Sequence, residues 1–127
     1  MPFSDYLNQK LLAKAFRGQD FEIPGHWCSL HTADPGKTGT DEVFGAPYER
    51  KQIPQFTETD TEGSAQRIRN IAALFFQVPA GTYTHIGLWN APTGGNFLGG
   101  GQLSGPATVN DGDFVIVREN DLAILQD

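Results

Sequence analysis

The chain has 127 residues, of which 39% are hydrophobic and 11% aromatic, with a formal net charge of −6 and a pI near 4.9. This length suits one domain with one core, and the apolar content excludes a disordered chain. Lys and Arg are spread along an acidic chain, which disfavours nucleic acid as a partner. We therefore expect a single folded domain over residues 1–127.

Cys28 is the only cysteine, so the fold has to form without an internal disulfide. No apolar stretch approaches the roughly 20 residues that cross a bilayer, and the N-terminus lacks the layout of a signal peptide. We expect a protein made in the cytoplasm, with no membrane partner. Scattered Gly (15) and Pro (8) indicate many turns and therefore many short strands.

A helix is predicted near the N-terminus, over residues 4–16. Ser4 suits the N-cap position and Gly18 the position after the helix, where the left-handed conformation is common. Apolar residues between them recur at steps of four, as on one face of an amphipathic helix. They are Phe3, Leu7, Leu11 and Ala15.

The following segments are rich in strand and turn signals. Residues 26–32 mix aromatic and apolar residues and predict a first strand, whereas residues 33–47 are rich in Gly, Pro, Thr and Asp and predict a surface loop. An edge strand is predicted over residues 48–56, where Pro54 removes a hydrogen-bond donor. Residues 67–78 form a continuous apolar run, which we interpret as one core strand.

The C-terminal part predicts two hairpins. Residues 83–89 and 97–103 flank a turn rich in Asn, Pro and Gly, and residues 108–109 and 114–117 flank Asn110-Asp111-Gly112-Asp113. A last strand is expected around residues 122–125. Turns about every ten residues predict a mainly β protein, a β-sandwich of jelly-roll character over residues 24–127 behind one N-terminal α-helix. The predicted core is Leu7, Leu11, Trp27, Leu30, Ile71, Leu74, Phe76, Ile86, Leu88, Leu98, Phe114, Ile116 and Leu122.

Several short motifs share residues with known cofactor or metal sites. Gly36-Lys37-Thr38 resembles the end of a phosphate-binding loop, but His31 stands where that motif needs its first glycine. His26 and His31 would lie on opposite faces of a strand, which disfavours a metal site with His85. The Asn110–Asp113 segment lacks the length of a calcium loop and fits a turn better. We predict no cofactor and no metal.

Catalysis has weak support in the sequence. Cys28 could act as a nucleophile with His31 or His85 as its base, but a small buried core residue is the favoured interpretation. The acidic residues, such as Asp34 and Glu62, lie in polar segments that predict turns, where carboxylates are solvated. We predict no catalytic residues and no enzyme.

Most of the chain resembles small bacteriophage tail-fibre-like proteins. The resemblance is carried by Phe3-Ser4-Asp5-Tyr6-Leu7-Asn8-Gln9-Lys10-Leu11-Leu12, by Leu30-His31-Thr32-Ala33-Asp34-Pro35-Gly36, by Glu42-Val43 and Gly45-Ala46-Pro47-Tyr48 with Arg50, by the stretch from Thr84 to Leu98, and by the segments from Gly101 to Leu103 and from Thr108 to Asp113. These are patterns of turns and core residues, and no catalytic residue comes with them. The resemblance implies a structural protein of the virion.

The function that we expect is a tail-fibre-like or particle-decorating subunit, acting as a homo-oligomer that binds tail components or the major capsid protein. An alternative is a capsid cement protein that stabilises the shell, and a further one is a module that binds host glycans through exposed aromatic residues such as Trp89. Predicted protein-contact residues lie on the helix and on the loop of residues 35–48. They are Tyr6, Lys10, Val43, Phe44 and Tyr48.

Overall fold

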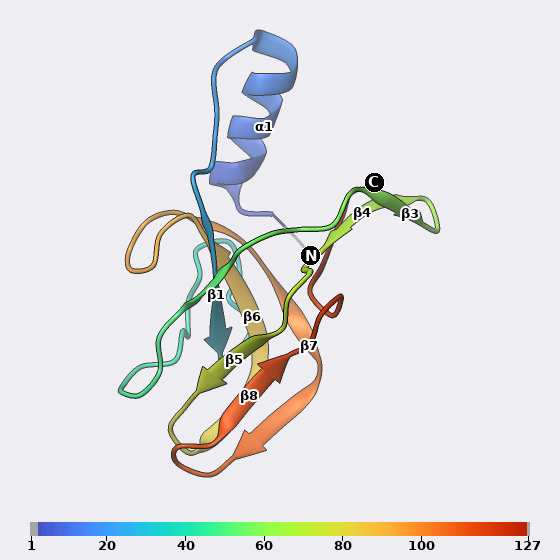
Figure 1. Cartoon of the computed structure of the whole chain (residues 1–127). Coiled ribbons are helices and arrows are strands. Elements are labelled where there is room, and N and C mark those ends of the chain that lie inside the picture. Colours follow the sequence, from blue (N-terminus) through green and yellow to red (C-terminus); the bar gives the residue numbers. More distant parts are fainter. Residues whose placement is uncertain (1–2, 127) are drawn as a thin grey trace.

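A computed structural model describes residues 3–126 and confirms a mainly β protein with one N-terminal helix (Figure 1). Met1, Pro2 and Asp127, the ends of the predicted domain, lie outside the described residues. The described elements are α1 (Asp5–Arg17), β1 (His26–His31), β2 (Lys51–Ile53), β3 (Asp60–Glu62), β4 (Ala65–Arg69), β5 (Leu74–Gln77), β6 (Gly81–Trp89), β7 (Phe97–Val109), β8 (Phe114–Val117) and β9 (Ala123–Gln126). No helix among them is long and apolar enough to cross a membrane.

Helix α1 begins and ends where its capping residues predict. The Ser4 hydroxyl accepts a hydrogen bond from the Leu7 amide at 3.1 Å, and Gly18 takes the left-handed conformation with φ 67°. The helix stands at the top of the molecule in Figure 1 and buries only Leu7. Its start is tied to the body because the Ser4 amide donates to the Leu98 carbonyl of β7 at 2.8 Å.

The largest sheet has four antiparallel strands in the order β2-β1-β6-β7. The first predicted hairpin is present, because β6 pairs with β7. Strand β1 is hydrogen-bonded to the other edge of β6. The predicted edge strand is confirmed in a shorter form as β2. On the opposite edge, β7 runs for 13 residues, with a register shift against β6 next to the segment that holds Pro106.

Two smaller sheets complete the fold, in the orders β3-β4-β9 and β5-β8. They correct the prediction of one strand over residues 67–78, because β4 and β5 belong to different sheets. They also correct the second predicted hairpin, because β8 pairs with β5 while the end of β7 pairs with β6. The chain bends between β4 and β5 at Asn70, which is fully buried. Its side-chain nitrogen donates to the carbonyls of Ala72 and Arg118 at 2.9 and 3.0 Å, and its oxygen accepts from the Leu122 amide. The jelly-roll arrangement remains a prediction.

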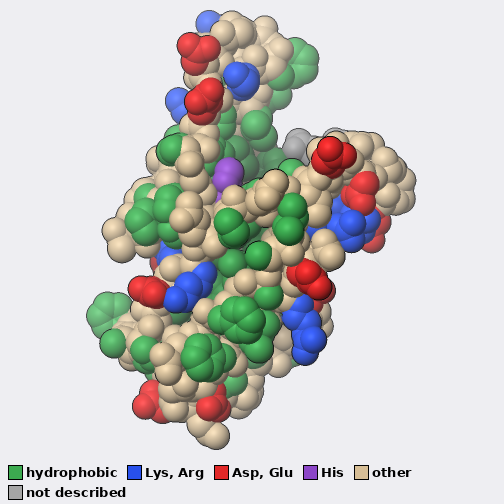
Figure 2. All heavy atoms as spheres, viewed as in Figure 1, with side chains coloured by type: hydrophobic (Ala, Val, Ile, Leu, Met, Phe, Trp, Pro, Cys, Tyr) green, Lys and Arg blue, Asp and Glu red, His purple; other side chains and the backbone are tan. Residues whose placement is uncertain are grey.

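The core lies between the sheets and includes most of the predicted residues. Leu30, Phe76, Ile86, Leu88 and Leu98 are at most 4% exposed. Three predicted core residues, Ile71, Phe114 and Ile116, are instead 43–55% exposed, which corrects that part of the prediction. In β8 the alternation of the strand turns Val115 and Val117 inward and the two larger residues outward. Hydrophobic side chains accordingly gather on the surface over the β5–β8 sheet, in the lower part of Figure 2.

Candidate functional site

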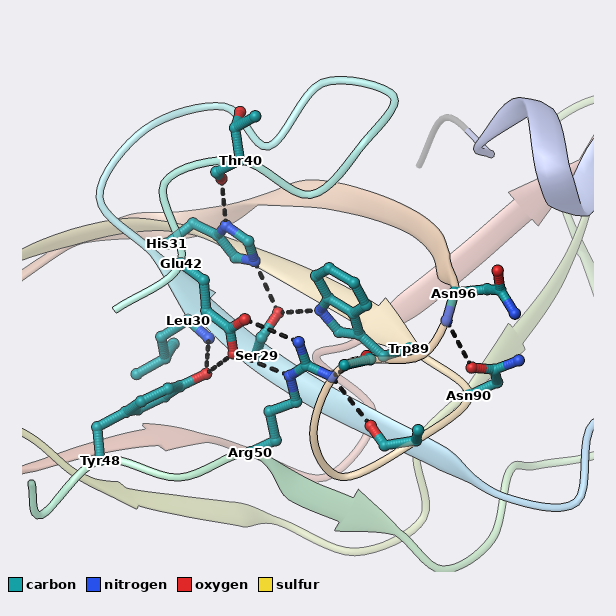
Figure 3. A network of polar contacts seen from close by, with 12 residues as sticks. Ser29, Leu30, His31, Thr40, Glu42, Tyr48, Arg50, Trp89, Asn90 and Asn96 are labelled. Atoms are coloured by element: carbon teal, nitrogen blue, oxygen red, sulfur yellow. Dashed lines mark hydrogen bonds and ion pairs between the residues drawn. The ribbon is translucent and has the colours of Figure 1, made fainter. Parts of the chain in front are cut away.

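Two loops meet at one end of the four-stranded sheet and are joined by Arg50 (Figure 3). We call residues 32–50, between β1 and β2, the long loop, and residues 90–96, between β6 and β7, the short loop. Arg50 Nη1 donates to the carbonyls of Ala91 and Gly94 in the short loop, at 3.0 and 2.8 Å. Its Nε and Nη2 donate to the two carboxylate oxygens of Glu42 in the long loop, both at 2.9 Å. One side chain thus fixes both loops.

The Arg50–Glu42 pair is shielded from solvent. The Arg50 side chain is 7% exposed, and its guanidinium lies 3.9 Å from the ring centre of Trp89. Burial alone would raise the pKa of Glu42, but the hydrogen bonds from Arg50 and Tyr48 outweigh it and the pKa is lowered. Glu42 is therefore held as a charged, bidentate partner of Arg50.

Tyr48 links this pair to the central strands. Its hydroxyl donates to Glu42 at 2.7 Å and accepts from the Leu30 amide of β1 at 3.2 Å, while its ring stacks on Phe76 in the core. Burial, together with the Glu42 charge, raises the pKa of Tyr48, so the hydroxyl stays protonated and remains a donor. The long loop is thereby anchored to both the sheet and the core.

A second buried chain of hydrogen bonds runs through Ser29 and His31. Trp89 Nε1 donates to the Ser29 hydroxyl at 2.8 Å, and that hydroxyl lies 2.7 Å from His31 Nε2. His31 Nδ1 lies 2.7 Å from the carbonyl of Thr40 in the long loop. A neutral His31 with its proton on Nδ1 satisfies every partner, since Ser29 then donates to Nε2. Burial lowers the pKa of His31 despite the opposing bond to Thr40, in keeping with this neutral form.

Two glycines make room for this network. A Cβ on Gly87 of β6 would come within 2.6 Å of Ser29 Oγ and 2.7 Å of His31 Nε2. Gly39 in the long loop has φ +80°, and a Cβ there would lie 2.5 Å from the Trp89 ring. Both positions therefore require glycine for the loops to close over the buried polar side chains.

Ser29 and His31 have the contact of a nucleophile and its base, but both are fully buried beneath the loops. Their bonds serve to hold Trp89 and the long loop in place. Cys28 is also fully buried, and burial raises the pKa of its thiol, in accord with the favoured core interpretation. Among the described residues, no three His, Cys, Asp or Glu side chains are grouped so that they could hold a metal ion.

The structure brings together three of the five predicted contact residues. Val43, Phe44 and Tyr48 line a surface hollow of about 530 Å³, which Pro92 and its neighbours in the short loop close on the other side. Phe44 is 96% exposed. We call this hollow and its rim the loop face.

Tyr6 and Lys10 lie apart from the loop face, on α1. The Tyr6 ring packs edge-on against Phe21, with 6.3 Å between ring centres, and Lys10 Nζ lies 5.8 Å from the Tyr6 ring centre. These two residues therefore belong to the helix and to the chain that returns beside it.

The buried residues that hold the two loops in place were not predicted from the sequence. Glu42, Arg50 and His31 lie in segments that carry the family resemblance, but no role was predicted for them in the site. Their pairing depends on the path of the long loop, and Ser29 carries no local motif. The expectation of an exposed Trp89 for glycan binding is wrong: Trp89 is 9% exposed and packs between Arg50 and Phe97. Buried under the loops, its ring has no face left for a sugar.

The family model described as the podophage GP4 fiber I protein gp80 matches residues 2–125. The chain belongs to this family. This fibre-family chain is thus a structural protein of the bacteriophage virion, as the tail-fibre-like resemblance predicts. Among curated proteins, the search finds no match.

Proposed function

We propose that this fibre-family protein acts by binding, without catalysis, and that its loop face attaches it to another protein of the virion. The observation that carries the proposal is Phe44, which is 96% exposed on a loop held by the buried Arg50–Glu42 pair. An exposed aromatic side chain on an ordered loop loses little conformational entropy on binding, which is the usual property of an interface anchor. Val43 and Pro92 extend the apolar surface around it.

The partner that we propose is a tail component. The description of the family, a fibre protein, supports the tail, while the capsid cement alternative rests on small size and acidic charge. We also propose that the protein is made in the host cytoplasm and joins the particle there as a homo-oligomer. The helix around Tyr6 and Lys10 then forms a second contact surface.

The loop face is tested by incorporation into particles. Phage lacking the gene are complemented with Val43→Ala/Phe44→Ala protein, and the amount in purified virions is measured by quantitative mass spectrometry. We expect incorporation to fall at least tenfold, which corresponds to about 1.4 kcal/mol of binding free energy. Thr38→Ala, an exposed change in the same loop, is the matched control. Normal incorporation of the double variant, with an unchanged thermal midpoint, would show that the loop face is not the attachment surface.

The same measurement separates tail from head. In wild-type virions we expect a handful of copies per particle, on the order of a small cyclic ring. A copy number close to that of the major shell protein would instead identify a capsid cement protein and refute the tail assignment.

A further inference from the structure

Two apolar surfaces outside the loop face lack a partner within residues 3–126. The first, which we call the helix patch, consists of Leu12 and Phe16 on α1, which are 60% and 83% exposed. The second, the sheet patch, consists of Phe75, Phe114 and Ile116 on the outer face of the β5–β8 sheet, each about half exposed. Figure 2 shows the sheet patch as hydrophobic side chains in the lower part of the view.

The helix patch lies on an arm that is poorly supported by the rest of the chain. A 13-residue helix is marginally stable alone in water, and in α1 only Leu7 is fully buried, with Tyr6 and Leu11 packed against the core in part. The arm is also basic: Lys10, Lys14 and Arg17 against Asp5 give it +2 in a chain of −6, which leaves −8 on the remainder. A partner that covers the helix patch and carries negative charge would stabilise the arm.

The sheet patch has the complementary properties. Phe75 and Ile116 are direct cross-strand partners, and their neighbours on the opposite face, such as Phe76 and Val115, are buried in the core. The patch is thus the bare side of a two-stranded layer.

Acidic residues border the patch. Asp113 precedes Phe114 at one end, and Arg118, Glu119 and Asp121 line a hollow of about 500 Å³ with Phe75 and Ile116 at the other. Three acids and one base give this border a net charge of −2.

We propose that α1 of one copy packs across the β5–β8 sheet of a second copy. A helix is about 10 Å wide, which matches two strands that lie about 4.8 Å apart. Within one chain the two patches cannot meet, because α1 stands at the top of the molecule and the β5–β8 sheet lies near the bottom (Figure 1). This inference rests on the proposed homo-oligomer and names its contact.

Charge favours the pairing of a helix patch with a sheet patch over the pairing of two helix patches or of two sheet patches. Two sheet patches placed face to face would bring two acidic borders together, and two arms would bring two +2 charges together. Lys10 and Lys14 lie on the side of α1 away from Phe16, so their attraction acts across the width of the helix, within the Debye length of about 10 Å at 0.1 M salt. Arg17 is only about a quarter turn from Phe16 and can flank the contact.

A contact between unlike patches leaves one helix and one sheet free at the ends of each dimer, so copies add head to tail, into a ring if the rotation closes and into a filament if it does not. The sheet patch offers roughly 300 Å² of apolar surface, from two half-exposed phenylalanines and an isoleucine. That is below the roughly 800 Å² per partner of a standard interface. Association of the free protein is therefore expected to be weak and dependent on concentration.

The test is a mixing experiment on the full chain, followed by sedimentation velocity from about 10 to 500 μM in low salt. We expect the wild type to self-associate, and Phe16→Asp and Phe75→Asp each to shift the association at least tenfold to higher concentration. A one-to-one mixture of the two variants should regain association but stop at dimers, because one intact helix patch meets one intact sheet patch. Ser64→Asp, at the exposed tip between β3 and β4, is the control for added charge.

Other outcomes overturn the inference. A monomeric wild type at every concentration removes the interface, and association of Phe75→Asp like the wild type indicates helix pairing instead. A mixture that stays monomeric while both variants remain folded by circular dichroism excludes the pairing of one intact helix patch with one intact sheet patch. Association of Phe16→Asp like the wild type indicates pairing of two sheet patches instead. Incorporation of the Val43→Ala/Phe44→Ala variant reports separately on the loop face, so failure of one proposal is distinguishable from failure of the other.

Discussion

The loop end of the molecule buries polar side chains, whereas α1 and the β5–β8 sheet expose apolar ones. At the loop end, Ser29, His31 and Arg50 are withdrawn from solvent, and each of their side-chain polar groups has a partner within the same chain. On the β5–β8 sheet, Phe75 and Phe114 are more than half exposed with no cover from the described residues. The polar groups of the first region are satisfied within one chain. The apolar side chains of the second region are the ones that a second chain would bury.

This difference shows that polarity alone does not decide which residues are inside. A buried polar group is tolerated when its hydrogen bonds are satisfied, and removal of one partner then costs more than the bond itself contributes. An exposed apolar group costs the isolated chain little, and it becomes favourable when another surface covers it. The two regions should therefore respond in opposite ways to substitution.

The largest contrast is expected between two predicted core positions, Ile86 and Phe114. Ile86→Asp places a carboxylate at a site that is 4% exposed and should lower the free energy of unfolding by more than about 4 kcal/mol, enough to prevent folding. Phe114→Asp, at a site that is 55% exposed, should lower it by only about 1–2 kcal/mol, in proportion to the share of the ring that is buried. Guanidinium unfolding followed by circular dichroism measures both. Equal effects at the two positions would contradict the burial pattern of the structure.

Arg50→Ala should have the next largest effect, about 3–5 kcal/mol, because it leaves Glu42 partly buried without its charge partner. The change also removes the bonds to the short loop and the contact with Trp89. Lys51→Ala breaks the neighbouring pair with the exposed Glu49 and should have little effect, which makes it the control. Recovery of most of the lost stability in Arg50→Met/Glu42→Gln would identify the unpaired charge as the cause. If Arg50→Ala unfolds at the same denaturant concentration as the wild type, the pair does not hold the loops.

Gly87→Ala should lower the free energy of unfolding by about 1–3 kcal/mol, because its Cβ would collide with Ser29 and His31. The Trp89 indole N–H signal in NMR spectra should shift as its bond to Ser29 is disturbed. Gly105→Ala, where nothing lies within 4 Å of the new Cβ, is the matched control in a neighbouring strand. Equal stability of the two variants would mean that the network adapts without cost.

The smallest effect is expected from pH. Because burial lowers the pKa of His31 in the folded state, the unfolded state binds more protons, and stability is fully present only above the ordinary value of 6.5. The free energy of unfolding should fall below pH 6.5, by at most about 1.4 kcal/mol per pH unit for this group. The decline should be shallower in His31→Gln but not absent, since burial also lowers the pKa of His26. An identical decline in His31→Gln would exclude His31 as the source.

Glu42 should add a second decline in more acidic solution. Its folded pKa is lowered, so its contribution is present above the ordinary value of 4.5 and is lost as pH falls below it. The free energies of unfolding of Glu42→Gln and the wild type, measured as a function of pH, should therefore converge towards low pH. Parallel curves down to the acid limit would contradict the charged pair with Arg50.

Local signals made α1 and the β6–β7 hairpin predictable, whereas the second predicted hairpin is wrong, because β7 and β8 pair in different sheets. Ser4 and Gly18 mark the helix ends through their own backbone and side-chain chemistry, and the Asn110–Asp113 turn closes through a bond from the Asn110 amide to the Asp113 carboxylate at 3.1 Å. The strand phase of β8 was not predictable, because Phe114-Val115-Ile116-Val117 is apolar on both faces. Residues 67–78 are also mostly apolar, and one continuous strand was wrongly predicted there. Nothing local shows that the chain bends at Asn70, whose side chain bonds to Leu122 and Arg118 from far along the chain.

The candidate site divides in the same way. Val43, Phe44 and Tyr48 were predicted as contact residues because apolar side chains are unusual in a long polar loop, and the structure gathers them around one hollow. That gathering leaves their role a prediction. Arg50 and Glu42 could not be paired from the sequence, because they stand eight positions apart along irregular backbone and only the folded path of the loop brings them together.

Both edges of the four-stranded sheet resist the addition of a foreign strand. The first half of β7 is occupied by the Phe3–Gly99 bridge, and its second half carries Pro106, which has no amide hydrogen to offer. On the opposite edge, β2 is only three residues long and Pro54 follows it directly. Exposed strand edges are the usual starting points of β-aggregation, and short strands and proline are common protections. Copies that are crowded together during particle assembly are therefore expected to associate through side-chain surfaces. Pairing of their strand edges, which could continue without limit, is disfavoured.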